Sequence, residues 1–281
     1  MRRACVRLQG ALTVAYSKYV AVDATPKTGA RTSNFDQFIK FPILNCHNKR
    51  ETNLVMHNLT NPIFNDELLR HISANLEQFD RRPSFPQESL KKAAVAVTIV
   101  DHQNGSDHLQ RPSSGPTTGR AAMILTRRAA TLKAHAGQWA LPGGQMEAGE
   151  RPEDTVLREL EEEVGLRLDA DAVIGRLDDY DTRSGFTIKP VVLWGGTDLT
   201  LRPNPGEVAS IHLIPLAEFM REDAPILEDI PESENPVLLM PVGNTCIAAP
   251  TAAIIYQFRE VAILGNDRRV AHYEQPYFAW H

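Results

Sequence analysis

Residues 144–166, which read GQMEAGERPEDTVLRELEEEVGL, constrain this chain more than any other segment. The second half of the segment has apolar residues at the spacing of one helix face, which predicts a helix that packs against a core. Three glutamates fall on the neighbouring arc of the same helix. The apolar residues are Val156, Leu157, Leu160 and Val164, and the glutamates are Glu159, Glu162 and Glu163. The segment therefore predicts a helix with one face for a core and another for a cation.

The acidic face of this helix has two interpretations. Glutamates three and four positions apart repel one another, and a hard divalent ion such as Mg2+ or Mn2+ relieves that repulsion because it prefers carboxylate oxygens. The alternative is an ordinary acidic face that is exposed to solvent. The residues around the helix decide between these two interpretations.

The sequence on either side of the predicted helix favours the interpretation as a metal site. Residues 141–144, LPGG, predict a strand end followed by a turn whose backbone can approach a ligand closely. Pro152 suits the first turn of a helix, and Gly165 suits its end. Arg158 precedes Glu162 by four residues, so its guanidinium can hold a carboxylate in one orientation.

With these residues in place, segment 144–166 resembles the Nudix box, G-x5-E-x7-R-E-U-x-E-E-x-G-U, where U is aliphatic. The matching residues are Gly144, Glu150, Arg158, Glu159, Leu160, Glu162, Glu163, Gly165 and Leu166. The resemblance implies an α/β fold, the Nudix α/β/α sandwich with a mixed β-sheet, here with N-terminal and C-terminal extensions. It also implies a hydrolase that uses Mg2+ or Mn2+ to cleave nucleoside diphosphate derivatives.

The resemblance also assigns roles to the residues of the box. It implies that Glu159 and Glu163 are the main metal ligands, with the Gly144 carbonyl in support. Glu162 is either a further ligand or the group that receives the proton of the attacking water. Glu207, on a separate loop, is an alternative proton acceptor. The expected catalytic residues are Glu150, Arg158, Glu159 and Glu162.

The segment before the box resembles the signature of coenzyme A pyrophosphatases, L-L-T-x-R-[SA]-x3-R-x3-G-x3-F-P-G-G. Lys133 stands where the pattern has Arg, and Leu141 stands where it has Phe; a lysine lacks the bidentate fork of an arginine. The matching residues are Ile124, Leu125, Thr126, Arg128, Ala129, Gly137, Pro142, Gly143 and Gly144.

This second resemblance implies a substrate. Coenzyme A or an acyl-CoA would be cleaved to 3′,5′-ADP and (acyl-)4′-phosphopantetheine, with Arg128 and Lys133 binding the substrate. One alternative is a Nudix hydrolase of ADP-ribose, NADH or a dinucleoside polyphosphate. The other is a non-catalytic Nudix module that binds a nucleotide and regulates a partner.

The chain divides into an extension and one domain. Residues 1–60 are expected to form a flexible N-terminal extension, with organelle targeting as the alternative. Residues 61–281 are expected to form the hydrolase domain, with a core at about 92–220, a flanking N-terminal helix and a C-terminal helical extension. Helices are predicted at 66–79, 152–164, 215–220 and 251–263, and strands at 93–100, 121–126, 173–180, 186–193 and 208–214, with a loop at 101–118.

The composition of the chain limits the classes of partner that we expect it to bind. The formal net charge of −5 argues against a general nucleic-acid binder. The longest uncharged run, 235–258, contains three prolines, so no membrane span is expected. We expect a cytoplasmic protein whose partner is a small-molecule nucleotide, and a homodimer is one assembly it could form. The aromatic C-terminus (Tyr273, Tyr277, Phe278, Trp280) is interpreted as a tail that packs on the core, with stacking on an adenine or a pantetheine as the alternative.

Overall fold

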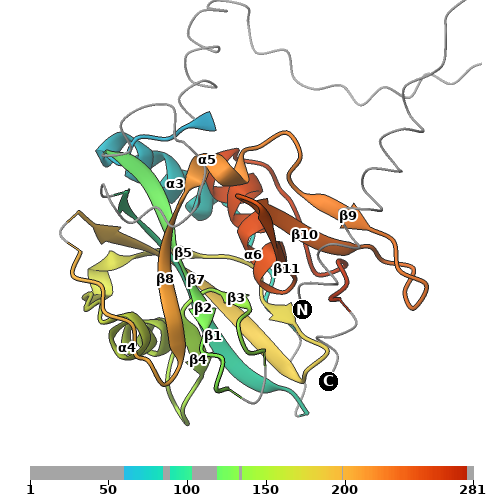
Figure 1. Cartoon of the computed structure of the whole chain (residues 1–281). Coiled ribbons are helices and arrows are strands. Elements are labelled where there is room, and N and C mark those ends of the chain that lie inside the picture. Colours follow the sequence, from blue (N-terminus) through green and yellow to red (C-terminus); the bar gives the residue numbers. More distant parts are fainter. Residues whose placement is uncertain (1–59, 85–88, 103–118, 133–134, 198, 277–281) are drawn as a thin grey trace, which may run out of the picture. The chain divides into compact units, whose positions relative to one another are not determined.

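The computed structural model describes residues 60–84, 89–102, 119–132, 135–197 and 199–276 (Figure 1). Several predictions lie outside these residues. They concern the N-terminal extension apart from Thr60, most of the loop at 101–118, Lys133, and the aromatic residues Tyr277, Phe278 and Trp280.

The centre of the domain is an eight-stranded mixed sheet built around β1 (Lys91–His102). This strand is parallel to β7 (Phe186–Gly196) and antiparallel to β2 (Arg120–Arg128). The main strand order is β3-β2-β1-β7-β5, with β4 on β1, β6 on β7 and β8 on β2. The remaining strands are β3 (Trp139–Ala140), β4 (Gly143–Gln145), β5 (Val173–Arg176), β6 (Tyr180–Asp181) and β8 (Val208–Pro215).

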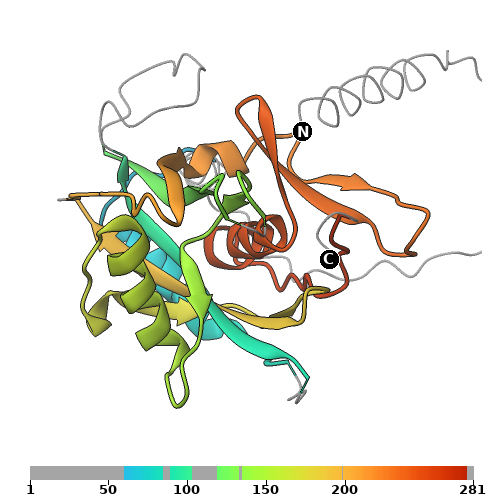
Figure 2. The same ribbon diagram turned by 60° about the horizontal axis from the view of Figure 1, so that its bottom comes forward.

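Helices cover both faces of this sheet, as predicted for an α/β/α sandwich. On one face, α4 (Pro152–Val164) buries Val156, Leu160 and Val164 against the small side chains of Ala94 and Ala96. The other face packs against the remaining helices, and Figure 2 shows α4 and α6 on opposite sides of β1. These other helices are α3 (Asp66–Gln78), α5 (Leu216–Phe219) and α6 (Thr251–Phe258).

The helix α4 begins and ends where the sequence predicts. Pro152 occupies its first turn, and Gly165 follows its last residue with φ of 70°, a left-handed conformation that glycine adopts without strain. The Gly165 amide donates to the carbonyls of Glu161 and Leu160. This ending fixes the direction in which the chain leaves the helix.

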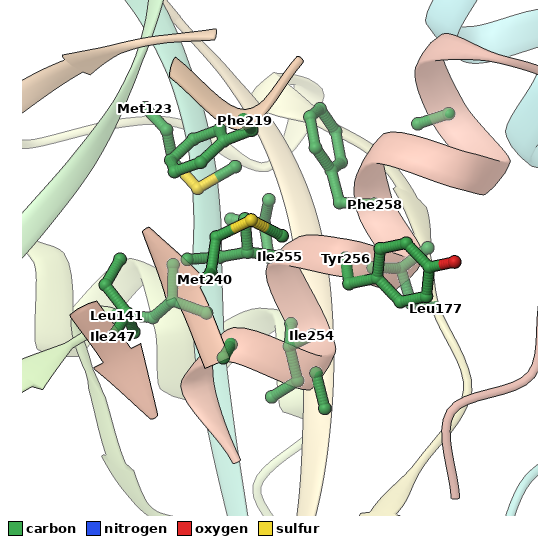
Figure 3. Packing of buried hydrophobic residues seen from close by; sticks show 14 of the residues in the cluster. Met123, Leu141, Leu177, Phe219, Met240, Ile247, Ile254, Ile255, Tyr256 and Phe258 are labelled. Atoms are coloured by element: carbon green, nitrogen blue, oxygen red, sulfur yellow. The ribbon is translucent and has the colours of Figure 1, made fainter. Parts of the chain in front are cut away.

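The C-terminal part contains more strand than predicted. A three-stranded sheet of β9 (Ile226–Glu228), β10 (Val237–Val242) and β11 (Thr245–Ala248) precedes α6, which continues into a π-helix at Arg259–Ile263. All six residues of β10 are buried, so the strand has no alternating pattern to identify it. Its Met240 packs with Phe219, Ile255 and Phe258 in the core between the two sheets (Figure 3).

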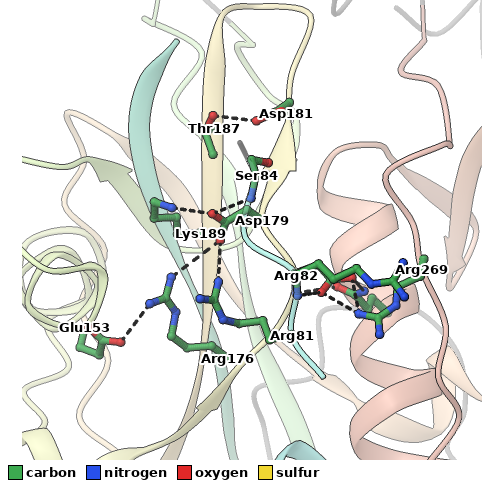
Figure 4. Close-up of polar contacts among 12 residues, drawn as sticks. Arg81, Arg82, Ser84, Glu153, Arg176, Asp179, Asp181, Thr187, Lys189 and Arg269 are labelled. Atoms are coloured by element: carbon green, nitrogen blue, oxygen red, sulfur yellow. Dashed lines mark hydrogen bonds and ion pairs between the residues drawn. The ribbon is translucent and has the colours of Figure 1, made fainter. Parts of the chain in front are cut away.

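The predicted strand 173–180 is interrupted by two adjacent buried carboxylates that take separate partners (Figure 4). Asp179 accepts from Lys189 at 2.5 Å and from Arg81 at 3.1 Å. Asp178 accepts from Arg269 at 2.9 Å and from the Gln257 amide at 2.8 Å. The two residues therefore connect the sheet to the segment after α3 and to the C-terminal segment.

Among the described residues, none of the helices combines the length and the apolar character that crossing a membrane requires.

Candidate functional site

Three carboxylates converge beside α4. Ligand oxygens of Glu159, Glu163 and Glu207 all lie within 4.8 Å of one another. Glu159 and Glu163 come from one face of the helix and are 8% and 4% exposed, whereas Glu207 comes from the loop before β8 and is exposed. Three acidic groups this close repel one another strongly unless a cation or protons neutralise them.

Gly143 and Gly144, which were predicted to form a turn, begin the strand β4 because they pair with Val95 and Ala94 of β1, and they lie against the two helical carboxylates. The Gly143 amide donates a hydrogen bond to Glu163 Oε2 at 3.1 Å. A Cβ on Gly144 would overlap the Glu159 carboxylate, and a Cβ on Gly143 would overlap the backbone carbonyl of Ala94. Only glycine permits this approach of β4 to α4 and β1.

Arg158 connects three carboxylates, those of Glu150, Glu159 and Glu162. Its Nε donates to Glu150 Oε1 at 3.0 Å, and its Nη1 donates to Glu159 Oε1 at 2.8 Å and to Glu162 Oε2 at 3.1 Å. The bond from Arg158 lowers the pKa of Glu150 to about 2, so Glu150 is ionised at neutral pH. The arginine thereby orients one carboxylate of the candidate metal site.

The loop that carries Glu207 is bonded to the end of α4. The Asn204 amide donates to the carbonyl of Glu163 at 2.9 Å, and the Arg202 amide donates to the carbonyl of Val164 at 2.8 Å. The Asn204 carbonyl then accepts the amide of Glu207 at 3.0 Å. The first two bonds satisfy carbonyls at the end of α4 that have no partner within the helix. Together with the third bond, they hold Glu207 near α4.

Burial makes two of the three carboxylates hard to ionise without a cation. The pKa of Glu163 is raised to about 7, mainly by burial and also by the nearby Glu159, while the bond from Gly143 opposes the shift. Burial also raises the pKa of Glu159, although Arg158 opposes the shift. A set of carboxylate oxygens with this charge fits a hard divalent cation such as Mg2+ or Mn2+.

Arg128, at the end of β2, supplies positive charge beside this acidic group. It pairs with Val208 between β2 and β8, next to Glu207, and its charge lowers the pKa of Glu163. Within the described residues its guanidinium forms no ion pair, and its buried Nε has no hydrogen-bond partner. The neighbouring Arg127 is engaged elsewhere, because its guanidinium stacks at 3.9 Å on Trp139 and donates to the Gly137 carbonyl.

The structure brings together most of the residues that the sequence predicts for the site. Glu159, Glu163 and Gly144 meet in one place, with Arg158 and Glu150 beside them. Glu162 lies apart from the three converging carboxylates, because its half-exposed side chain pairs with Arg158. Glu207, which the sequence analysis names only as an alternative proton acceptor, is the third member of the group.

Comparisons with known proteins agree with this geometry. Residues 115–231 match the model of the NUDIX domain. An uncharacterized Nudix hydrolase NudL of Pectobacterium atrosepticum is 33% identical over 195 residues, which cover 68% of this chain and 92% of that protein. The NudL of Cronobacter sakazakii is 38% identical over 143 residues, 50% of this chain and 66% of that protein.

A solved structure of a MutT/nudix family protein from Enterococcus faecalis also aligns. It is 17% identical, with a TM-score of 0.40 over 62% of each chain, and this weak likeness carries no weight here. The assignment rests on the family model and on the Pectobacterium relative, which is matched over nearly its whole length. The chain belongs to the Nudix hydrolase family.

Proposed function

We propose that this protein is a divalent-metal-dependent hydrolase of the diphosphate linkage in a nucleoside diphosphate derivative. The supporting observation is that opposite charges meet at the site: Arg128, which forms no ion pair among the described residues, pairs with Val208 beside Glu207 and lowers the pKa of Glu163 by its charge. A diphosphate needs both groups, because its oxygens bind a guanidinium and a carboxylate-held cation at the same time.

The residues divide into two roles in this proposal. Glu159 and Glu163 hold the cation with help from the Gly144 carbonyl, and Arg158 keeps Glu159 in place. A bound divalent ion would neutralise the charge of the diphosphate and make a water molecule more acidic. Arg128 binds a phosphate oxygen and orients the phosphorus atom toward that water.

The proton of the attacking water goes to Glu207 in this proposal. The water oxygen forms a bond to phosphorus, the bridging P–O bond breaks, and the leaving phosphate takes the electron pair. Glu207 is the exposed member of the three carboxylates and comes from a loop rather than from α4. Glu162 is less suited to this role, because Arg158 already binds its carboxylate at 3.1 Å.

We propose coenzyme A or an acyl-CoA as the substrate and the cytoplasm as its place of action. The support is the signature that runs from Ile124 to Gly144, in which Arg128 is matched and Lys133 and Leu141 are substituted. Lys133 lies outside the described residues, so its substrate-binding role stays a prediction. The products would be 3′,5′-ADP and (acyl-)4′-phosphopantetheine.

A substrate panel tests both levels of the proposal. The full-length protein is incubated with Mg2+ or Mn2+ and with CoA, acetyl-CoA, ADP-ribose, NADH or a dinucleoside polyphosphate, and the products are identified by mass spectrometry. We expect cleavage of CoA and acetyl-CoA. Consumption of another compound while CoA survives would contradict the CoA assignment. Binding of a nucleotide without cleavage of any compound would favour the regulator.

A further inference from the structure

Thr155 lies in the second turn of α4 with a fully buried side chain. Its hydroxyl Oγ1 donates to Glu150 Oε2 at 2.7 Å. The same hydroxyl lies 3.2 Å from the carbonyl of Arg151, the contact that a threonine often makes within its own helix. Because the contact to Glu150 is 0.5 Å shorter and the acceptor is charged, the hydroxyl proton belongs mainly to the carboxylate.

Glu150 receives several donors, and Thr155 differs from the others. The Glu147 amide at 2.9 Å and Arg158 Nη2 at 3.2 Å donate to the same Oε2. Glu147 is exposed, and the Arg158 side chain is 27% exposed. Of these three donors to Oε2, Thr155 is therefore the one whose side chain the core holds in place, and its bond is the shortest.

We propose that Thr155 is a positioning residue for the candidate metal site. Its hydroxyl fixes the Glu150 carboxylate, Glu150 fixes the Arg158 guanidinium, and Arg158 fixes Glu159 through the 2.8 Å bond. Thr155 falls in the unspecified x7 stretch of the box, so the motif assigns it no role. This inference rests on the proposed function, because it takes Glu159 to be a ligand.

Two substitutions distinguish the positioning role of the Thr155 hydroxyl from the packing of its methyl group. Thr155→Val keeps the shape of the side chain and removes the hydroxyl, whereas Thr155→Ser keeps the hydroxyl and removes a buried methyl group. For T155V we expect Mn2+ affinity to fall about tenfold, as is typical when the group that orients a metal ligand is lost. T155S should restore the wild-type affinity although it lowers the melting temperature of the metal-free protein.

Thr98, on the strand β1, provides a matched control for Thr155. It is fully buried on β1, and among the described residues its hydroxyl has no hydrogen-bond partner. Thr98→Val therefore removes a buried hydroxyl without removing a bond, and it should leave Mn2+ affinity unchanged. A loss in T98V as large as in T155V would assign the effect to core packing and overturn the proposal.

A double-mutant cycle tests whether Thr155 acts through Glu150. In Glu150→Gln protein the chain of contacts is already broken, so T155V should cause little additional loss of Mn2+ affinity. Full additivity of the two losses would overturn the proposal, as would a T155V protein that binds Mn2+ as tightly as wild type. Mn2+ titration needs no substrate, so a wild-type protein that binds Mn2+ and cleaves no diphosphate contradicts only the proposed function.

Discussion

The Glu159 carboxylate occupies the space that a side chain on residue 144 would need. The strand β4 and the helix α4 are thus fitted to each other at a contact between a glycine and a carboxylate of the candidate metal site. We expect Gly144→Ala to displace Glu159 and to lower Mn2+ affinity by about tenfold or more, measured by calorimetric titration. Gly185→Ala is the control, because alanine at its φ of 87° is strained while the space around it is open. It should cost stability without changing Mn2+ affinity.

Substitutions of Glu163 and Glu207 should have different effects on Mn2+ affinity and on turnover. Glu163→Gln removes a buried carboxylate that we propose as a metal ligand, so both Mn2+ affinity and turnover should fall, turnover by several orders of magnitude. Glu207→Gln removes the proposed proton acceptor, so kcat should fall while Mn2+ affinity changes much less. Parallel Mn2+ titration and steady-state kinetics check this difference. Equal losses of Mn2+ affinity in the two variants would make Glu207 a ligand rather than a base.

Substitution of Arg128 should affect the reaction with the substrate rather than the binding of the metal. We expect Arg128→Ala to lower kcat/KM for CoA about 10- to 100-fold, the range for a lost hydrogen bond to a charged group. Arg128→Lys should recover part of this loss, because it keeps the charge and loses the fork. Arg120, at the other end of the same strand, provides the control R120A, whose kcat/KM should match wild type. Unchanged kinetics in R128A would remove this residue from the substrate site.

The stability of the metal-free protein should fall as pH rises. Glu163 has an ordinary pKa of 4.5, and burial raises it to about 7 in the folded protein. Between these two values the folded chain binds a proton that the unfolded chain releases, so the free energy of unfolding decreases with pH, by up to about 3 kcal/mol. Urea unfolding in EDTA at pH 5 and pH 8 measures the difference. E163Q should show a much smaller difference in the free energy of unfolding between pH 5 and pH 8, and it should be more stable than wild type at pH 8.

The helix of the box could be predicted completely because every signal for it is local. Pro152 starts it, Gly165 ends it, and the apolar residues between them repeat at helical spacing. The place of Glu207 could not be predicted in this way. It depends on the pairing of Arg128 with Val208 between β2 and β8, and on the bonds from Asn204 to the end of α4. Contacts of this kind join segments far apart in the chain.

The elements that the sequence misplaced share a physical cause. The buried strand β10 has apolar residues on both faces, so periodicity gives no signal for it. The break before β6 is made by Asp178 and Asp179, whose partners include Arg81, 98 positions before Asp179, and Arg269, 91 positions after Asp178. In the sequence alone, an aspartate that is buried in a pair with a distant arginine cannot be distinguished from an aspartate that is exposed to solvent.

The central strand β1 lies outside the segment 115–231 that the family model matches, although β2, β4 and β7 all pair with it. A fragment trimmed to those boundaries would lose the partner of three strands at once and leave their edges open to other chains. Such a fragment should aggregate when it is expressed. The shortest fragment that folds should begin before Asp66, where α3 starts, and extend through Glu274, whose carboxylate pairs with Arg183.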